Sequence, residues 1–272
     1  MLDAAYAAGV RYFDAARSYG MAENFLGTWL QDRRPIRDGI TIGSKWGYTY
    51  VGSWKLDAAV HEVKDHSLDT LRRQIVESRS ILGDYLRLYQ IHSATLESRV
   101  LEDAAVLREL LHWQSNGLVI GLSVSGSNQA EVIRRALDVS VDGRNPFQAV
   151  QATWNLLEPS AGAALAEAKT RSWMVIVKEA LANGRLTNRA EGAHVSPLRK
   201  VADLHATTID AVALGAALAN SWADVVLSGA VTTGQLDSNL NSLALAQNLT
   251  EWPDIAESPH DYWKRRSALP WQ

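Results

Sequence analysis

The sequence predicts a (β/α)8 barrel, an α/β fold of the TIM-barrel kind, in which seven of the eight strands can be read. Short apolar runs typical of strands alternate with amphipathic stretches of helical spacing along the 272 residues. Several runs are almost continuously apolar, as in parallel strands that helices cover on both faces. So many strand–helix repeats favour a closed barrel. No linker or change in composition divides the chain, and we expect a single domain spanning residues 1–272.

The predicted elements follow one another at regular intervals. The strand-like runs are residues 10–15, 40–44, 86–91, 119–125, 147–154, 173–179 and 224–230. The helix-like stretches between them include residues 22–32, 69–83, 100–117 and 208–222. Gly83 and Gly117 stand where helices are expected to end, and Ser127 and Asn128 form a plausible cap before QAEVIRRAL.

The number of strands is one short of eight. The first residues, LDAAYAAG, read as the second half of a helix that leads into the run at 10–15. A barrel without one strand exposes two parallel edges, here 10–15 and 224–230, and such edges invite aggregation or foreign pairing. The open interpretations are an unrecognised strand, an open barrel, or a chain that begins late or is truncated, of which we favour the last.

Composition excludes several classes of function. A net charge of −3 gives no basic footprint for nucleic acid, and no apolar stretch approaches the roughly 18 residues of a membrane span. The chain has no cysteine, which excludes disulfides, thiolate catalysis and cysteine metal sites. We expect a cytoplasmic protein without a nucleic-acid or membrane partner, and the sequence leaves the oligomeric state open.

Four reactive side chains lie at or just after the ends of the first three strand-like runs, and they are Asp14, Tyr19, Lys45 and His92. In parallel barrels, catalytic groups come from the carboxyl ends of several strands. This set suggests proton transfer to or from a carbonyl. Taken singly, each residue also has a purely structural interpretation, such as a strand-ending cap, a loop aromatic, a solvated lysine or a buried histidine.

Other chemistries match the sequence less well. His61 and His66 are five residues apart, which is not the spacing of an HxH or HExxH metal site, so we expect no metal. The SVSG run is not a GxSxG nucleophile motif, and VSGSNQ lacks the lysine of a P-loop. A barrel with an aldolase-type lysine stays as an alternative, because Lys45 and Lys178 both end strands.

The segments that carry these residues resemble the aldo-keto reductase superfamily. Residues 9–27, with Asp14 and Tyr19, resemble its first signature, and Lys45 in SKWGY and His92 in LYQIHS follow in order. The similarity continues through residues 120–126, 150–158, 178–186 and 228–240. The resemblance implies reduction of an aldehyde, ketone or sugar carbonyl by NAD(P)H, or the reverse reaction. Tyr19 would donate the proton, Lys45 would lower the pKa of that phenol, Asp14 would hold Lys45, and His92 would orient the substrate oxygen.

The resemblance also implies a cofactor site. Its residues would be Ser123, Gln151, Lys178, Leu181, Asn183, Gly184, Arg185, Ser228, Gly229, Gln235 and Asn239. Three positions depart from the family pattern: Val124 replaces an asparagine, Lys178 an aromatic ring, and Val231 an arginine that pairs with the 2′-phosphate. The choice between NADP and NAD therefore stays open.

Aromatic residues suggest where a substrate would lie at the mouth of the barrel. Trp46 and Tyr48 follow the lysine, together with Tyr50 and Trp54, and Trp271 lies in a tail that could close over the mouth. We expect Trp29, Trp113 and Trp222 to be packing residues instead. Two alternatives to a reductase are a truncated inactive relative and a regulatory barrel that binds nicotinamide nucleotide with little turnover.

Overall fold

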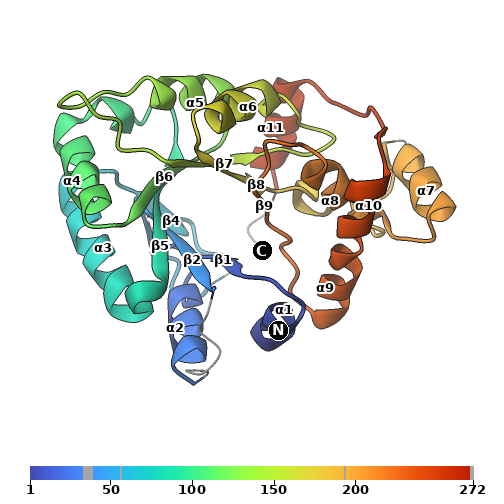
Figure 1. The fold of residues 1–272 in the computed structure, drawn as a ribbon, viewed down its shortest axis with the longest axis horizontal. Coiled ribbons are helices and arrows are strands. Elements are labelled where there is room, and N and C mark those ends of the chain that lie inside the picture. The colour runs from blue at the N-terminus through green and yellow to red at the C-terminus, as the bar shows by residue number, and fades with distance from the viewer. Residues whose placement is uncertain (33–38, 56, 193, 270–272) are drawn as a thin grey trace.

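Seven parallel strands form one curved sheet in the order β1-β2-β5-β6-β7-β8-β9 (Figure 1). The computed structural model describes residues 1–32, 39–55, 57–192 and 194–269. The strands are β1 (Tyr12–Asp14), β2 (Thr41–Trp46), β5 (Leu86–Ala94), β6 (Val119–Val124), β7 (Ala149–Thr153), β8 (Met174–Lys178) and β9 (Val225–Val226). Each one lies within or overlaps a predicted run, so the prediction of seven parallel strands is confirmed.

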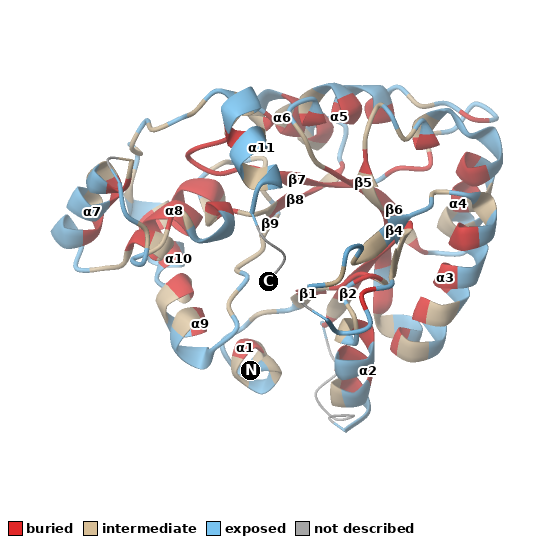
Figure 2. Ribbon diagram, turned by 180° about the vertical axis from the view of Figure 1, so that it is seen from behind, coloured by how far each residue is buried: buried red, intermediate tan, exposed pale blue. Residues whose placement is uncertain are grey.

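Most of the helices lie outside this sheet, and Figure 2 shows that the helices next to the sheet turn their buried residues towards it. Helix α1 (Leu2–Ala7) precedes β1, and between the strands lie α2 (Ala22–Asp32), α3 (Leu68–Leu82), α4 (Ala104–Ser115), α5 (Gln129–Leu137), α6 (Gly162–Thr170), α7 (Val195–Leu204) and α8 (Ile209–Leu218). After β9 come α9 (Thr233–Leu240), α10 (Ser242–Asn248) and α11 (Pro259–Ser267). Short 3-10 turns are η2 (Gly83–Tyr85), η3 (Val100–Glu102) and η4 (Ala182–Gly184). Gly83 and Gly117 adopt positive φ where α3 and α4 end, as predicted.

The inward faces of the strands change character along the barrel axis. Since alternate residues of a strand face the same side, the strands contribute inward-facing side chains at successive levels along the barrel axis. Towards the amino ends these are apolar, and they form a small cluster around Leu88, Ala149 and Ile176. Towards the carboxyl ends they are polar or charged, namely Asp14, Lys45, Gln90, His92, Ser123, Gln151, Thr153 and Lys178. The barrel therefore carries its reactive groups at one end.

The barrel is not closed by hydrogen bonds. Among the described residues, no strand pairs with the free edge of β1 or with that of β9. These are the two edges that the sequence predicted to be exposed. Both ribbon views place α1 beside α9 next to this opening (Figures 1 and 2).

Some elements had no clear sequence signal. A two-stranded antiparallel hairpin, β3 (Tyr48–Tyr50) and β4 (Glu62–Lys64), is inserted after β2. Asn128 occupies the position before α5, but its side chain makes no capping bond. No single described helix is long and apolar enough to cross a membrane, and only α7 and α8 together, bent by 93°, reach that length and composition.

Candidate active site

A buried ion pair between Lys45 and Asp14 is the centre of the candidate site. The ammonium of Lys45, at the end of β2, contacts Oδ2 of Asp14, at the end of β1, because parallel pairing places these strand ends side by side. The same ammonium donates to the carbonyl oxygen of Ala15 at 2.9 Å. It lies 5.1 Å from the centre of the Tyr19 ring. Three of the four predicted residues therefore lie together.

Asp14 is held by more than the lysine. Its other carboxylate oxygen accepts from Nε2 of Gln151 at 2.9 Å and from the hydroxyl of Tyr12 at 3.2 Å. Gln151 lies on β7, so this bond spans the barrel. Tyr12 was not predicted as part of the site, although its spacing of two residues from Asp14 places both side chains on one face of β1.

Burial and charge act in opposite directions on Lys45 and Tyr19. Burial alone lowers the pKa of Lys45, but Asp14 and then Tyr19 outweigh it and raise that pKa above its ordinary value. Tyr19 is 47% exposed, yet desolvation at the mouth is the largest influence on its pKa and raises it. Lys45 lowers the pKa of Tyr19, as predicted, but not enough to reverse the net shift. The predicted effect of Lys45 is thus present, but burial outweighs it, and the net pKa of Tyr19 lies above its ordinary value.

His92, near the end of β5, completes the set. Its ring centre lies 5.5 Å from that of Tyr19 and 4.9 Å from that of Tyr48. Nδ1 lies 3.5 Å from Oγ of Ser18. Burial, followed by the nearby charges of Lys45 and Lys178, holds the pKa of His92 well below its ordinary value. The imidazole is therefore neutral at neutral pH.

The predicted substrate-pocket residues have three different outcomes. Tyr48 is half-buried beside His92. Trp46 is completely buried and belongs to the hydrophobic core, so its ring does not line an open pocket. The reason is that Trp46 faces outward from β2, opposite to the inward-facing Lys45. Trp271 lies outside the described residues. Trp29, Trp113 and Trp222 pack against the core, as expected.

Three predicted cofactor residues lie on neighbouring strands, β6, β7 and β8. Ser123 and Gln151 are buried, and Oγ of Ser123 accepts from the backbone N–H of Ser93 at 2.8 Å. Lys178 donates to Oγ1 of Thr153 at 3.0 Å. Burial is the largest influence on the pKa of Lys178 and lowers it. These three residues face the mouth from the side opposite β1 and β2.

The loop after β8 has an unusual backbone. Ala182, Asn183 and Gly184 have consecutive positive φ angles of 48°, 53° and 90°. Leu181 precedes them, and a Cβ added to Gly184 would meet no atom within 4 Å. Arg185, however, makes a two-pronged ion pair with Glu257 at 3.1 and 2.5 Å. In this structure, Arg185 is therefore engaged by a carboxylate rather than free.

The third predicted segment runs from the loop after β9 into α9. The amide of Asn239 and Oγ of Ser228 are 2.9 Å apart. Gln235 forms a capping box with Thr232, and its Oε1 also accepts from the backbone N–H of Val231. Gly229 has a φ of 66° with open space where a Cβ would lie. Val231 is exposed, so its position can accept a longer side chain.

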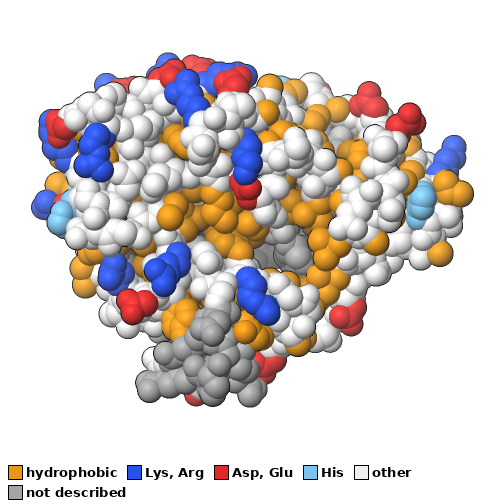
Figure 3. Space-filling view, in the orientation of Figure 1, with side chains coloured by type: hydrophobic (Ala, Val, Ile, Leu, Met, Phe, Trp, Pro, Cys, Tyr) orange, Lys and Arg blue, Asp and Glu red, His pale blue; other side chains and the backbone are white. Residues whose placement is uncertain are grey.

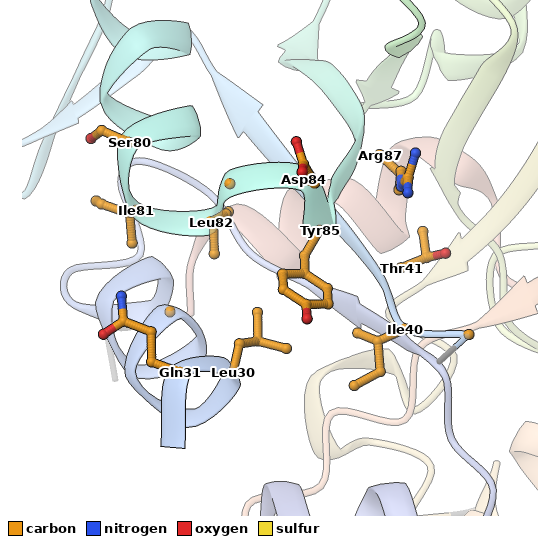
Figure 4. A pocket seen from close by; sticks show the side chains of 13 residues that line it. Leu30, Gln31, Ile40, Thr41, Ser80, Ile81, Leu82, Asp84, Tyr85 and Arg87 are labelled. Carbon is orange, nitrogen blue, oxygen red and sulfur yellow. The ribbon is translucent and has the colours of Figure 1, made fainter. Parts of the chain in front are cut away.

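The face shown in Figure 3 has a hollow bordered by hydrophobic side chains. A separate pocket of about 660 Å³ lies at the amino ends of β2 and β5, between α2 and α3 (Figure 4). It is at the end of the barrel opposite the ion pair. Gln31 and Gly39 line it and flank residues outside the described part, so we assign it no ligand. The described residues contain no cluster of His, Asp and Glu suited to a metal ion.

The fold and the site together define a class of protein, that of parallel α/β barrels with a polar site at the carboxyl ends of the strands. The sequence matches the aldo/keto reductase family over residues 1–258, and the chain belongs to this family. The family expected from the sequence motifs is thus confirmed.

Individual relatives are more distant. Norsolorinic acid reductase of Aspergillus flavus is 29% identical over 160 residues, 57% of this chain and 39% of that protein. The chain thus spans less than half of that relative's length. Aldo-keto reductase str7 of Strobilurus tenacellus is 25% identical over 281 residues, covering 92% of this chain and 77% of that protein.

Solved structures have the same fold. Aldo-keto reductase AKR11C1 from Bacillus halodurans, in its holo form, superposes with a TM-score of 0.70 at 22% identity, covering 97% of this chain and 85% of its own. The glycerol dehydrogenase AKR11B4 from Gluconobacter oxydans gives a TM-score of 0.70 at 20% identity, covering 100% and 86%.

Proposed function

We propose that this protein is an NAD(P)H-dependent oxidoreductase that reduces an aldehyde, ketone or sugar carbonyl to the alcohol, or catalyses the reverse reaction, with Tyr19 as proton donor. The observation that carries the proposal is the Lys45 ammonium, fixed by Asp14 and placed beside the Tyr19 ring. A positioned acid next to a permanent cation is what a carbonyl oxygen needs as it gains negative charge.

The side chains divide the work between them. Because the pKa of Tyr19 is raised, its phenol is protonated at neutral pH and can donate a proton to the carbonyl oxygen. Lys45 then stabilises the phenolate that remains, and Asp14 keeps Lys45 charged. His92 is neutral and can hydrogen-bond the carbonyl oxygen through Nε2, since Nδ1 lies nearest to Ser18. Such a proton relay contributes roughly 10²- to 10⁴-fold in rate.

The same geometry supports a proposed location for the cofactor. Asp14, Tyr19, Lys45 and His92 all come from β1, β2, β5 and the segment after β1, so a hydride has to reach the carbonyl carbon from the other side. That side carries Ser123, Gln151 and Lys178. A nicotinamide nucleotide supplies the hydride when bound. The open space beside Gly184 and Gly229 fits the close approach of its phosphates and ribose to the backbone.

The residues expected to bind the adenosine end of the cofactor favour NADH, or the use of both NADH and NADPH, over strict specificity for NADPH. Residues 228–240 contain no Lys or Arg, and Arg185 is paired with Glu257. A 2′-phosphate without a cationic partner loses charge-assisted hydrogen bonds. We infer that the remaining residues, Ser228, Gln235 and Asn239, recognise the adenosine portion through neutral contacts.

Replacement of Tyr19 tests the proposal. Tyr19→Phe keeps the ring and removes the proton, so reduction should fall by at least about 10²-fold. Binding of NADH, followed by quenching of tryptophan fluorescence, should stay within twofold of wild type. Unchanged turnover in Tyr19→Phe would remove the assigned role. Stoichiometric oxidation of NADH by the wild type without turnover would favour a nucleotide-binding protein over a reductase.

A further inference from the structure

The β3–β4 hairpin is fixed over the mouth of the barrel. Lys64, at the end of β4, donates to the carbonyl oxygen of Ser93 at 2.8 Å. His66, two residues later, bonds the carbonyl oxygen of His92 at 2.9 Å through Nε2. The backbone N–H of Asp65 donates to Gly47 at 2.9 Å. The hairpin is therefore attached at the carboxyl ends of two neighbouring strands, β2 and β5, on the side of the candidate site that carries Lys45 and His92.

The connection that follows β3 presents an exposed tryptophan in a strained conformation. Ser53 and Trp54 have φ angles of 50° and 62°, in the left-handed region that costs free energy for residues other than glycine. The N–H of Trp54 donates to the hydroxyl of Tyr50 at 2.9 Å, and the two rings lie 5.3 Å apart. Even so, Trp54 is 70% exposed. The indole of Trp54 is thus exposed to solvent on a backbone in a strained conformation.

The indole lies beside the candidate proton donor. A Cβ added to Gly20 would lie 2.6 Å from Cη2 of Trp54, so the far edge of the indole rests against the residue that follows Tyr19. Tyr19 and Met21, on either side of Gly20, are themselves exposed. Within the described residues, an apolar surface thus borders the point where a proton would be delivered.

We propose that Trp54 binds the substrate, its indole face stacking on the planar ring of an aromatic aldehyde or ketone whose carbonyl lies at Tyr19. This inference rests on the proposed reductase function and adds the class of substrate. A conjugated carbonyl is coplanar with its ring, so fixing the oxygen at Tyr19 and His92 also fixes the ring plane. Offset stacking between aromatic faces is favourable beyond the area that it buries. The position of Trp54 against Gly20 favours a substrate over a protein partner, which would not need contact with the residue after Tyr19.

Paired substrates test this inference. The probes are 2-naphthaldehyde, which has a ring to stack, and propanal, which has none. In Trp54→Ala, KM for 2-naphthaldehyde should rise about tenfold, whereas KM for propanal and both kcat values stay within about twofold of wild type. Trp54→Phe should retain most of the affinity. Phe25→Ala removes another exposed aromatic residue, on α2, and should change neither KM.

Two outcomes would overturn the role of Trp54: no change in KM for 2-naphthaldehyde, or an equal rise for both aldehydes. A calorimetric titration of the protein with 2-naphthaldehyde, in the absence of cofactor, measures the same contact without turnover. If the wild type reduces neither aldehyde, the proposed function fails, while the titration still decides whether Trp54 contributes to ring binding. Weaker binding in Trp54→Ala than in Phe25→Ala supports the inference, and equal binding contradicts it.

Discussion

Lys45 and Lys178 end two parallel strands on opposite sides of the barrel mouth, yet their surroundings shift their pKa values in opposite directions. Among the described ion pairs, Asp14 pairs with Lys45 alone. This pairing outweighs the effect of burial and raises the pKa of Lys45. The nearest carboxylate oxygen to Lys178 belongs to Glu179, at 3.9 Å, and Arg266 binds the same carboxylate at 2.9 Å. Burial therefore dominates at Lys178 and lowers its pKa. Whether the pKa of a buried lysine is raised or lowered thus depends on whether its carboxylate partner also pairs with a second cation.

The same contrast extends to the two halves of the site. On the side of β1 and β2, one cation is committed to one carboxylate, and Asp14 is further fixed by Tyr12 and Gln151. On the side of β8, Glu179 and Glu257 each receive two cations, Lys178 and Arg266 in one case and Arg185 and Arg265 in the other. The first half suits a fixed proton relay. In the second half, two cations share each carboxylate, so one of them can pair with a bound anion while the other stays with the glutamate.

Stability measurements should separate the two lysines most strongly. Lys45→Met leaves the Asp14 carboxylate buried without its counter-charge, and the free energy of unfolding should fall by about 3–5 kcal/mol. Lys178→Met leaves Glu179 paired with Arg266, and the change should stay within about 1 kcal/mol. Urea unfolding at neutral pH measures both. Equal losses would mean that burial, which the two lysines share, sets the effect and that exclusive pairing does not distinguish the two sites.

His66, near the mouth of the barrel, extends this comparison of buried titratable groups to acid pH. Burial and then the charge of Lys64 lower the pKa of His66 to about 4, against about 6.5 for an unfolded chain. Stability from this group is full above pH 6.5 and is lost as the pH falls towards 4, by at most about 3 kcal/mol. In His66→Gln, whose amide can still donate to His92, this part of the acid loss should disappear. The exposed His205→Gln is the control, and an unchanged pH profile in His66→Gln would contradict the assignment.

An added cation on the β9 side should have the smallest effect. Val231→Arg places a guanidinium in the segment that has none, and we expect NADPH to bind about tenfold more tightly relative to NADH. Val231→Gln supplies a polar side chain without the charge and should leave the ratio near that of wild type. Fluorescence titration with both nucleotides gives the two affinities. No change in the ratio for Val231→Arg would place the 2′-phosphate away from residue 231.

The fold was largely readable because parallel strands covered on both faces are apolar runs. Helix α2 begins at the predicted residue, Ala22. The hairpin was not recognised, since β3 and β4 have three residues each, are only partly buried, and are separated by a connection of eleven residues. Three residues are too few for an alternating pattern to emerge.

Most residues of the site could be predicted from the sequence, but their pKa shifts and ion pairs could not. Asp14, Lys45 and His92 were identifiable because they stand at the ends of strands. The net pKa shift of Tyr19 depends on how deeply its hydroxyl is desolvated, which no spacing reveals. The pairing of Arg185 with Glu257 joins residues 72 apart in the chain and has no local signal. Gln151 was identified as a cofactor residue, whereas its contact with Asp14 required the register of β1 and β7.

The bond from Gln151 to Asp14 also has a consequence for how the chain folds. It joins residues 137 positions apart, about half the length of the protein. Contacts of such separation form late, because closing a long loop costs entropy before the contact is rewarded. The first strands can therefore pair early and bring Lys45 to Asp14, but the carboxylate acquires its last donor only when the far side of the sheet has folded round. Completion of the Asp14 hydrogen bonds thus reports that the sheet has folded round from β1 to β7.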